Sequence, residues 1–367
     1  MTERERFKAV FTGGDIDRLP VYYFGSWQAT KERWKAEGLD TQRLTGDAGP
    51  QIPGMDTDWE DGMWDCHGLA IVAPIPDGER KVLEETGDMI IVQEALGSIE
   101  RYSKLGQSIP YTIKHCLEPT RESWEHFKTL FDPKDPRRRP AGWEQKAEEL
   151  NKSGKMLAFL GGTLYGWLRN YMGVENISYL MYDDPGLFDE MAGYMCEYFM
   201  TLYEPILSKV RFDLAYFFED CCGSYGPLFS PEIYMKYYDA RYREMIQFYK
   251  SRGVALTMLD SDGKSDVLIP YWMGSGFDIM FPIEVGVWGA SPVELRKRFG
   301  RGLMMFGGVD KHVIPKGEDA IRAHLLSLRP AVLEGGYLPI PDHRIPPNCS
   351  YQDFLTYLRV YNEVFQL

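Results

Sequence analysis

The feature that most constrains the fold is a regular alternation in the second half of the chain. From about residue 154 onward, short apolar runs alternate with longer segments of helical periodicity, and both faces of each run are aliphatic or aromatic. The six runs are Met156–Leu160, Leu214–Phe218, Val254–Leu259, Asp278–Pro282, Leu303–Phe306 and Tyr337–Ile340. This rhythm predicts an α/β protein with parallel strands and crossover helices.

Two further runs in the N-terminal part complete a set of strands. Leu19–Phe24 follows a short N-terminal helix, and Leu69–Ala73 is a second candidate, so that eight strands are expected in all. Eight strands favour a (β/α)8 TIM barrel over an open doubly wound sheet, because no Gly-x-Gly-x-x-Gly turn follows the first strand. We therefore predict a single barrel domain over residues 1–367.

The region from about residue 40 to residue 150 is less regular and is predicted to be an excursion from the barrel. Two antiparallel strands are expected there, near Asp88–Gln93 and Ser98–Tyr102. The short basic cluster Lys134–Arg139 is interleaved with proline, which predicts a solvated loop.

Composition and charge restrict the class of partner. The chain is 44% hydrophobic, as in a globular protein, and carries 41 basic against 54 acidic residues, for a net charge of −13. Such a surface repels a polyanion, so nucleic acid is not an expected ligand. The start of the chain is charged and no apolar run reaches the length of a membrane span, so a cytoplasmic protein without membrane association is expected. Its six scattered cysteines predict free thiols rather than a disulfide framework.

Polar side chains follow the predicted strands at the point where each strand ends, which is where TIM barrels place their active sites. They include Glu219 and Cys222 after one strand, Asp260 and Asp262 after the next, then Glu284, and finally His343 in a proline-rich loop. Clustered carboxylates repel one another, so such a group needs a cation, shared protons or a cationic substrate. Each residue also has an ordinary explanation, since buried cysteines are commonly inert and Asp260 and Asp262 are suited to capping a turn.

Zn²⁺ accepts thiolate, imidazole and carboxylate ligands, and a catalytic zinc site has three protein ligands and one open position. The candidate metal ligands are Glu219, Cys222, Asp262 and His343. Because they come from separate strands, no local spacing motif supports the zinc site.

These motifs, taken in order, resemble the uroporphyrinogen decarboxylase superfamily over nearly the whole chain. The resemblance rests on the opening Arg4 to Val21, Glu219-Asp220, Gly226-Pro227-Leu228, Ser230-Pro231-Glu232, Asp260-Ser261-Asp262-Gly263, Pro282-Ile283-Glu284, Glu294-Leu295-Arg296 with Gly300, Gly307-Gly308-Val309-Asp310-Lys311 and Pro341-Asp342-His343-Arg344-Ile345-Pro346-Pro347. It implies a (β/α)8 barrel with its site at the carboxyl ends of the strands. The superfamily includes the decarboxylase itself and the zinc-dependent methyltransferases of corrinoid systems.

The two branches make different demands on the residues. The decarboxylases have a pair of arginines after the first strand that bind porphyrinogen carboxylates, whereas residues 22–29 here contain no arginine. His343 stands where that family has a site histidine. The coenzyme M methyltransferases place His-x-Cys where this chain has Asp260-x-Asp262, and a further Cys where His343 stands. Harder ligands of this kind suit a metal that polarises an ether or alkoxide oxygen.

The resemblance therefore favours a metal-dependent methyltransferase acting as the O-demethylase component. It would move a methyl group from a small O-methylated substrate, aromatic compounds included, to the cobalamin of a separate corrinoid protein. Zinc is the expected metal, and the chain is expected to be a monomer or homodimer. We expect catalytic roles for Asp260, Asp262, Glu284 and His343, and substrate contacts from Trp27, Arg169 and Tyr225.

Two alternatives remain open from the sequence. The first is a metal-free decarboxylase acting on a smaller substrate, in which Asp262 and His343 handle protons. The second is a non-catalytic barrel that binds a corrinoid or tetrapyrrole for delivery.

Overall fold

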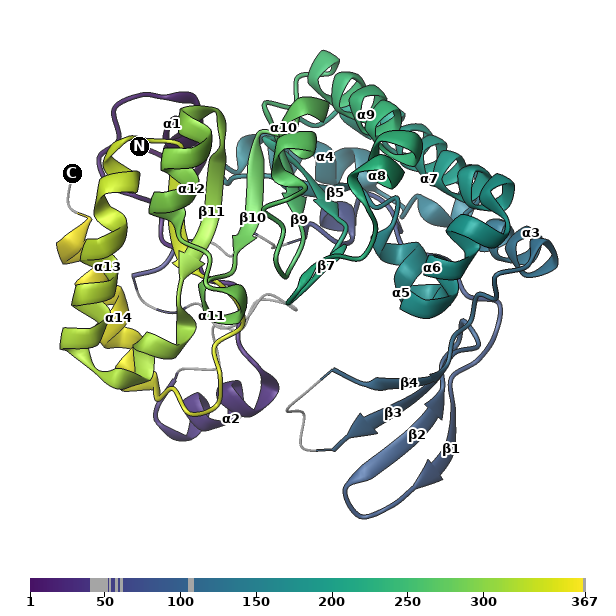
Figure 1. Cartoon of the computed structure of the whole chain (residues 1–367), viewed down its shortest axis with the longest axis horizontal. Helices are drawn as coiled ribbons and strands as arrows, with labels where there is room; N and C mark the ends of the chain where they lie inside the picture. Colours follow the sequence, from purple (N-terminus) through teal and green to yellow (C-terminus); the bar gives the residue numbers. More distant parts are fainter. Residues whose placement is uncertain (40–51, 53, 57–58, 60–61, 105–108, 366–367) are drawn as a thin grey trace.

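A computed structural model describes residues 1–39, 52, 54–56, 59, 62–104 and 109–365. At its centre is a parallel sheet of six strands in the order β12-β11-β10-β9-β6-β5 (Figure 1). The strands are β5 (Ala158–Gly162), β6 (Leu214–Phe218), β9 (Leu256–Asp260), β10 (Ile279–Ile283), β11 (Met304–Val309) and β12 (Tyr337–Pro341). All six predicted strands of the second half are confirmed, with ends that move by no more than a few residues.

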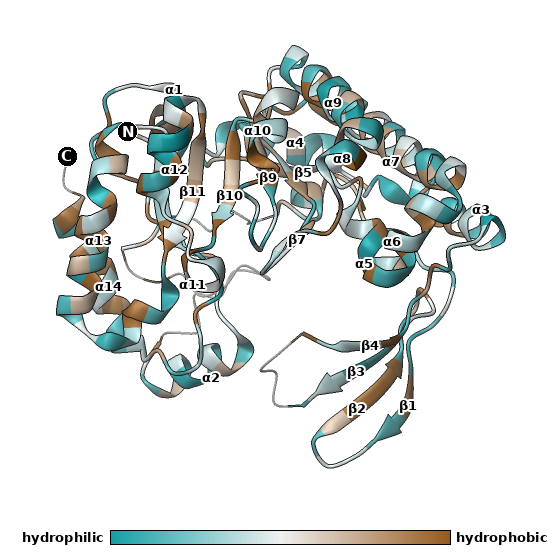
Figure 2. Ribbon diagram, viewed as in Figure 1, coloured by the Kyte–Doolittle hydropathy of each residue, from teal (hydrophilic) through white to brown (hydrophobic). Residues whose placement is uncertain are grey.

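Helices lie around the outside of this sheet, as the alternating pattern predicts (Figure 1). The helices are α1 (Glu3–Thr12), α2 (Gln28–Ala36), α3 (Arg121–Leu130), α4 (Trp143–Lys152), α5 (Gly166–Met172), α6 (Val174–Asp183), α7 (Pro185–Leu207), α8 (Pro231–Tyr237), α9 (Asp239–Ser251), α10 (Ile269–Ser275), α11 (Val285–Trp288), α12 (Pro292–Phe299), α13 (Glu318–Leu333) and α14 (Tyr351–Val364). The side chains of Ser230 and Ser291 cap α8 and α12 as predicted, accepting from the N–H groups of Ile233 and Glu294. Hydrophilic residues dominate the exposed faces of helices such as α9 (Figure 2).

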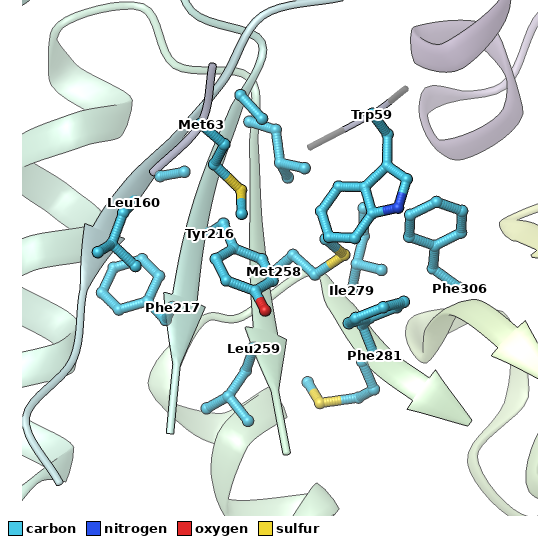
Figure 3. Packing of buried hydrophobic residues seen from close by; sticks show 14 of the residues in the cluster. Trp59, Met63, Leu160, Tyr216, Phe217, Met258, Leu259, Ile279, Phe281 and Phe306 are labelled. Atoms are coloured by element: carbon cyan, nitrogen blue, oxygen red, sulfur yellow. The ribbon is translucent and has the colours of Figure 1, made fainter. Parts of the chain in front are cut away.

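Large side chains pack against one another on the inner face of the sheet (Figure 3). The indole of Trp59 has its ring centroid 5.6 Å from that of Tyr216, 5.0 Å from that of Phe281 and 5.3 Å from that of Phe306. Trp59 comes from the irregular N-terminal part of the chain, so that part contributes directly to the core beside the sheet.

The described residues do not show a closed eight-stranded barrel, and Leu19–Phe24 does not join the strand ladder. Pro20 has no N–H to donate. The N–H of Val21 donates to a carboxylate oxygen of Asp56 (2.8 Å), and its carbonyl accepts from the N–H of Asp56 (3.0 Å). Just beyond this segment, Ser26 forms a parallel β-bridge with Ile345, which follows β12 in the sequence. The prediction of a first strand here is therefore wrong, because the backbone groups of Val21 are hydrogen-bonded to Asp56 instead of to another strand. Most apolar residues of the segment are nevertheless buried.

The segment Leu69–Ala73 also fails to form a strand, because Arg138 binds its backbone. The Arg138 guanidinium donates to the carbonyls of Ile71 and Ala73, and also to those of Asp132 and Leu130. Arg138 is only 1% exposed, so the prediction that Lys134–Arg139 is a solvated loop is wrong for this residue. The carbonyl groups supply the polar partners that allow a guanidinium to be buried.

The excursion contains a four-stranded antiparallel sheet that projects from the body of the molecule (Figure 1). Its strands are β1 (Lys81–Glu85), β2 (Met89–Gln93), β3 (Ile99–Ser103) and β4 (Tyr111–Lys114). The two predicted antiparallel strands correspond to β2 and β3 and are confirmed, whereas β1 and β4 were not predicted.

Two further observations concern the whole described chain. No helix among the described residues is both long and apolar enough to cross a membrane. All six cysteines are free, as their scattered positions predicted.

Replacing Arg138 by methionine tests the role of its buried guanidinium. The variant leaves four carbonyl groups without this donor, so we expect Arg138→Met to lower the free energy of unfolding by about 3 kcal/mol or more. Urea denaturation measures the effect. The matched control is Arg137→Met, because Arg137 has a 63% exposed side chain and pairs with the nearby Asp135; its expected change is within about 1 kcal/mol. Equal effects of the two substitutions would contradict the assignment.

Candidate active site

The carboxyl ends of the parallel strands place the predicted site residues at one edge of the sheet. Glu219 follows β6, Asp260 ends β9, Glu284 follows β10 and His343 lies two residues beyond β12. The strands β6 and β9 are in register with Phe218 opposite Asp260, which brings their following loops together. Contacts between Asp262 and His343 and between Gly263 and Glu284 bring the loops after β9, β10 and β12 together as well.

Asp262 and His343 form the pair at the centre of this edge. Nε2 of His343 lies 3.4 Å from Oδ2 of Asp262, and the two side chains are 21% and 37% exposed, respectively. Nδ1 of His343 accepts the N–H of Arg344 at 2.9 Å, so in the neutral ring the proton is on Nε2, facing Asp262. Oδ1 of Asp262 is buried and has no hydrogen-bond partner among the described residues. The pair can thus hold a proton between an imidazole and a carboxylate.

Aromatic stacking fixes the plane of the His343 ring. The ring of Phe24 stacks on it with centroids 4.9 Å apart and an angle of 18° between the planes. Phe24 stacks in turn on Phe281, with centroids 5.1 Å apart and an angle of 12°. Phe281 belongs to β10, so the imidazole is aligned by a column of rings that reaches back into the sheet.

Glu284 supplies a buried carboxyl group next to this pair. Its Oε2 accepts the N–H of Gly263 at 2.7 Å. Burial raises the pKa of Glu284 to about 7, with a further increase from the charge of Asp262 and an opposing effect of His343. Near neutral pH this carboxyl group therefore exchanges a proton readily.

Gly263 makes this arrangement sterically possible. Its φ is +84°, and a Cβ atom at this position would lie 2.6 Å from the carbonyl oxygen of Cys222. A glycine is thus required where the loop after β9 passes the short strand β7 (Cys222–Gly223), which pairs with β8 (Gly226–Pro227). The close approach places Asp262 beside the β6 loop.

Asp260 is turned toward the core rather than toward the pair. The Tyr216 hydroxyl donates to its Oδ2, and its backbone carbonyl accepts the N–H groups of Glu219 and Asp220. Asp260 therefore joins the ends of β6 and β9, and its predicted acid/base role stays a prediction.

Glu219 was predicted as a metal ligand, but both of its carboxylate oxygens are bonded to the backbone. Oε1 accepts the N–H of Leu164 (2.7 Å), and Oε2 accepts those of Tyr165 (2.8 Å) and Gly166 (3.0 Å). These N–H groups precede and begin α5, where free donors attract an anion. Burial raises the pKa of Glu219, while the donors oppose this effect. The structure therefore gives Glu219 a structural role at the start of α5, and its role as a metal ligand stays a prediction.

Cys222 is buried in β7, where it pairs with Pro227. Its neighbour Cys221 has a sulfur 3.7 Å from the Ser261 hydroxyl, and burial raises the pKa of that thiol well above its usual value. Among the described residues, no three His, Cys, Asp or Glu side chains are placed so that they could hold a metal ion. Of the four candidate ligands, Asp262 and His343 contact each other. As placed in the described structure, the set does not fit a zinc centre with three protein ligands. Zinc binding remains a prediction that metal analysis tests.

The three predicted substrate contacts lie in different surroundings. Trp27 has the Arg344 guanidinium 5.6 Å from its ring centroid. Nη2 of Arg169 lies 2.5 Å from Oδ2 of Asp220, so this arginine is already paired within the protein. Tyr225, in the turn between β7 and β8, is 99% exposed and is not packed against the Asp262–His343 pair.

Sequence reasoning missed three residues of this edge. Phe24 was assigned to a strand, Asp220 was noted only as part of a motif, and Asp342 was noted beside His343. Oδ2 of Asp342 accepts the N–H groups of Val285 (2.9 Å) and Gly286 (3.0 Å), which positions the start of α11 after Glu284. The proline-rich motif around His343 was the available signal for Asp342. No local pattern distinguishes Phe24 or Asp220.

Comparisons with known proteins identify a similar fold. No protein-family model matches the chain, and no curated protein matches it. A solved methyltransferase from Methanosarcina mazei is similar, with a TM-score of 0.58 and 13% identity over 99% of both chains. A B12-independent methionine synthase from Shewanella sp. W3-18-1, in complex with selenomethionine, aligns with a TM-score of 0.44 and 11% identity over 95% of this chain and 97% of that one. At such identity, the likeness to the methyltransferase establishes a related fold. The resemblance to the uroporphyrinogen decarboxylase superfamily remains a prediction.

Replacing Glu219 by glutamine tests its structural role. An amide has one acceptor oxygen in place of two, so at least one buried N–H group at the start of α5 loses its partner. We expect Glu219→Gln to lower the free energy of unfolding by about 2 kcal/mol, measured by urea denaturation. Glu294→Gln is the matched control, because Glu294 is exposed and should change stability by less than about 0.5 kcal/mol. An unchanged stability of Glu219→Gln would contradict the role.

The raised pKa of Glu284 predicts a pH-dependent effect of Glu284→Gln. The folded protein holds this proton more tightly than the unfolded chain, so ionisation of Glu284 weakens the fold as the pH rises from about 4.5 to about 7. The neutral glutamine removes this penalty. The stability of the variant relative to wild type should therefore increase from pH 5 to pH 8, by up to about 3 kcal/mol in urea denaturation. A difference that does not depend on pH would contradict the shift.

Proposed function

We propose that the protein is a methyltransferase that acts on a small O-methylated substrate and delivers the methyl group to the cobalamin of a separate corrinoid protein. The observation that supports this function is the Asp262–His343 pair, 3.4 Å between Nε2 and Oδ2, next to the buried Glu284 carboxyl group. The similarity to a methyltransferase fold agrees with the proposal.

The chemistry requires a proton at the oxygen that loses its methyl group. The carbon–oxygen bond breaks with its electron pair left on oxygen, and a proton donor at the site neutralises the oxygen as it leaves. The corrinoid cofactor, when its partner protein presents it, supplies the nucleophile that accepts the methyl group. The residues of this chain bind the ether, orient it and provide the proton.

His343 is the proposed proton donor. Its Nε2 carries a proton in the neutral ring and faces Oδ2 of Asp262. Glu284, with a pKa raised to about 7, can return a proton to the pair after each turnover.

Proton donation by the Asp262–His343 pair needs no metal ion. Both carboxylate oxygens of Glu219 accept backbone N–H groups, and its role as a zinc ligand is a prediction. The state of assembly, monomer or homodimer, also remains a prediction.

A decarboxylase acting on a small substrate is the second candidate. The Asp262–His343 pair favours it as well, because a carbanion left by the loss of carbon dioxide needs a proton from the same kind of donor. The two candidates differ in product. Methylcobalamin formed from methoxy compounds and cob(I)alamin indicates the first, and release of carbon dioxide without any cobalamin indicates the second.

Substitutions in the pair test the proposed chemistry. With a methoxy substrate and cob(I)alamin, we expect His343→Gln and Asp262→Asn each to lower kcat by about 10²-fold or more, followed by the absorbance of methylcobalamin. His126→Gln is the control, because His126 is 63% exposed and pairs with Asp77 at the surface. Full turnover by His343→Gln would exclude His343 as the proton donor.

A further inference from the structure

Asp220, which directly follows Glu219, has an unusual backbone conformation. Its φ is +41°, in the left-handed region. In the described part of the chain, the other residues besides glycine with positive φ are Cys66 and His67. An L-residue pays about 1–2 kcal/mol for this conformation, although aspartate tolerates it better than most. Asp220 is the one of the three that lies at the candidate active site.

The left-handed turn directs consecutive N–H groups toward the loop after β9. The N–H groups of Glu219 and Asp220 both donate to the Asp260 carbonyl, at 2.9 and 3.1 Å. The N–H of Cys221 donates to the Ser261 hydroxyl at 3.0 Å, and this hydroxyl donates to the Asp262 carbonyl at 3.1 Å. An unbroken series of hydrogen bonds therefore runs from the Asp220 turn to the backbone of Asp262.

The side chain of Asp220 holds the turn to α5. Its carboxylate pairs with Arg169, and Glu219 binds the N–H groups at the start of the same helix. A Cβ atom on Gly166 would lie 2.5 Å from the Phe218 carbonyl, so α5 is seated directly on the end of β6. Both neighbours of the turn, α5 and the β9 loop, are thus fixed in position.

We propose that Asp220 is a positioning residue whose left-handed turn sets the orientation of Asp262 against His343. The carboxylate of Asp220 pairs with Arg169 and also lies close enough to Asp262 and His343 to interact with their charges, whereas its turn acts through the β9 loop. The effect on turnover rests on the methyl-transfer function proposed above, whereas the effect on the position of Asp262 does not.

The matched variants Asp220→Gly and Asp220→Ala isolate the backbone conformation. Both remove the carboxylate and the bond to Arg169, but only glycine adopts positive φ without strain. The first readout is the imidazole NMR signal of His343 at fixed pH in protein with labelled histidine, assigned by its loss in His343→Gln. We expect the alanine variant to shift this signal relative to the glycine variant, and amide hydrogen exchange at residues 219–221 to be about tenfold faster in the alanine variant.

Turnover supplies the second readout. We expect kcat of Asp220→Ala to be about tenfold below that of Asp220→Gly, with similar KM, because substrate contacts are unchanged. Identical His343 signals in the two variants would overturn the proposal, even if both lost stability. If wild type methylates no cob(I)alamin from any methoxy compound, the proposed function fails while the NMR comparison still decides the role of Asp220. Should the alanine variant not fold, Asp220→Asn and Asp220→Ser give the same comparison, since asparagine tolerates positive φ better than serine.

Discussion

The bond between the buried Glu219 carboxylate and the backbone at the start of α5 is the constraint on which the site depends. Three N–H groups that have no partner within the helix converge on this one side chain at the end of β6. The interaction compensates the burial of a carboxylate and fixes α5 against the strand end. Asp220, Cys221 and the loop after β9 then have little freedom, and that loop carries Asp262.

A carboxylate-rich edge of this kind is stable because most of its acids are individually satisfied. Glu219 is bonded to the α5 backbone, Asp260 to Tyr216, Asp220 to Arg169 and Asp342 to the loop after β10. The sequence suggested that a shared cation would relieve the repulsion among these groups; each of these four acids also has a separate partner within the protein. Asp262, with an unpartnered oxygen, and Glu284, with its raised pKa, are the acids left to act on a proton or a substrate.

The sequence predicted the six parallel strands because burial on both faces makes each run continuously apolar, a pattern that needs no knowledge of distant contacts. It also predicted that Asp262, Glu284 and His343 lie at one edge, since parallel strands end together. It failed where a distant side chain forms hydrogen bonds with the backbone. Asp56 accepts the N–H of Val21, and Arg138 donates to the carbonyls of Ile71 and Ala73, so neither N-terminal run pairs as a strand. It did not predict that Glu219 binds the backbone at the start of α5, because a carboxylate that follows a strand gives the same sequence pattern whether it contacts a metal or a helix start.

The protonation state of His343 tests the central claim most directly. Nitrogen-15 NMR of histidine-labelled protein distinguishes a protonated from an unprotonated ring nitrogen. In the neutral ring, the account predicts an unprotonated Nδ1, which accepts from Arg344, and a protonated Nε2, whose shift changes in Asp262→Asn. A proton on Nδ1, or an Nε2 signal that does not respond to Asp262→Asn, would contradict the proposal that this pair donates the proton.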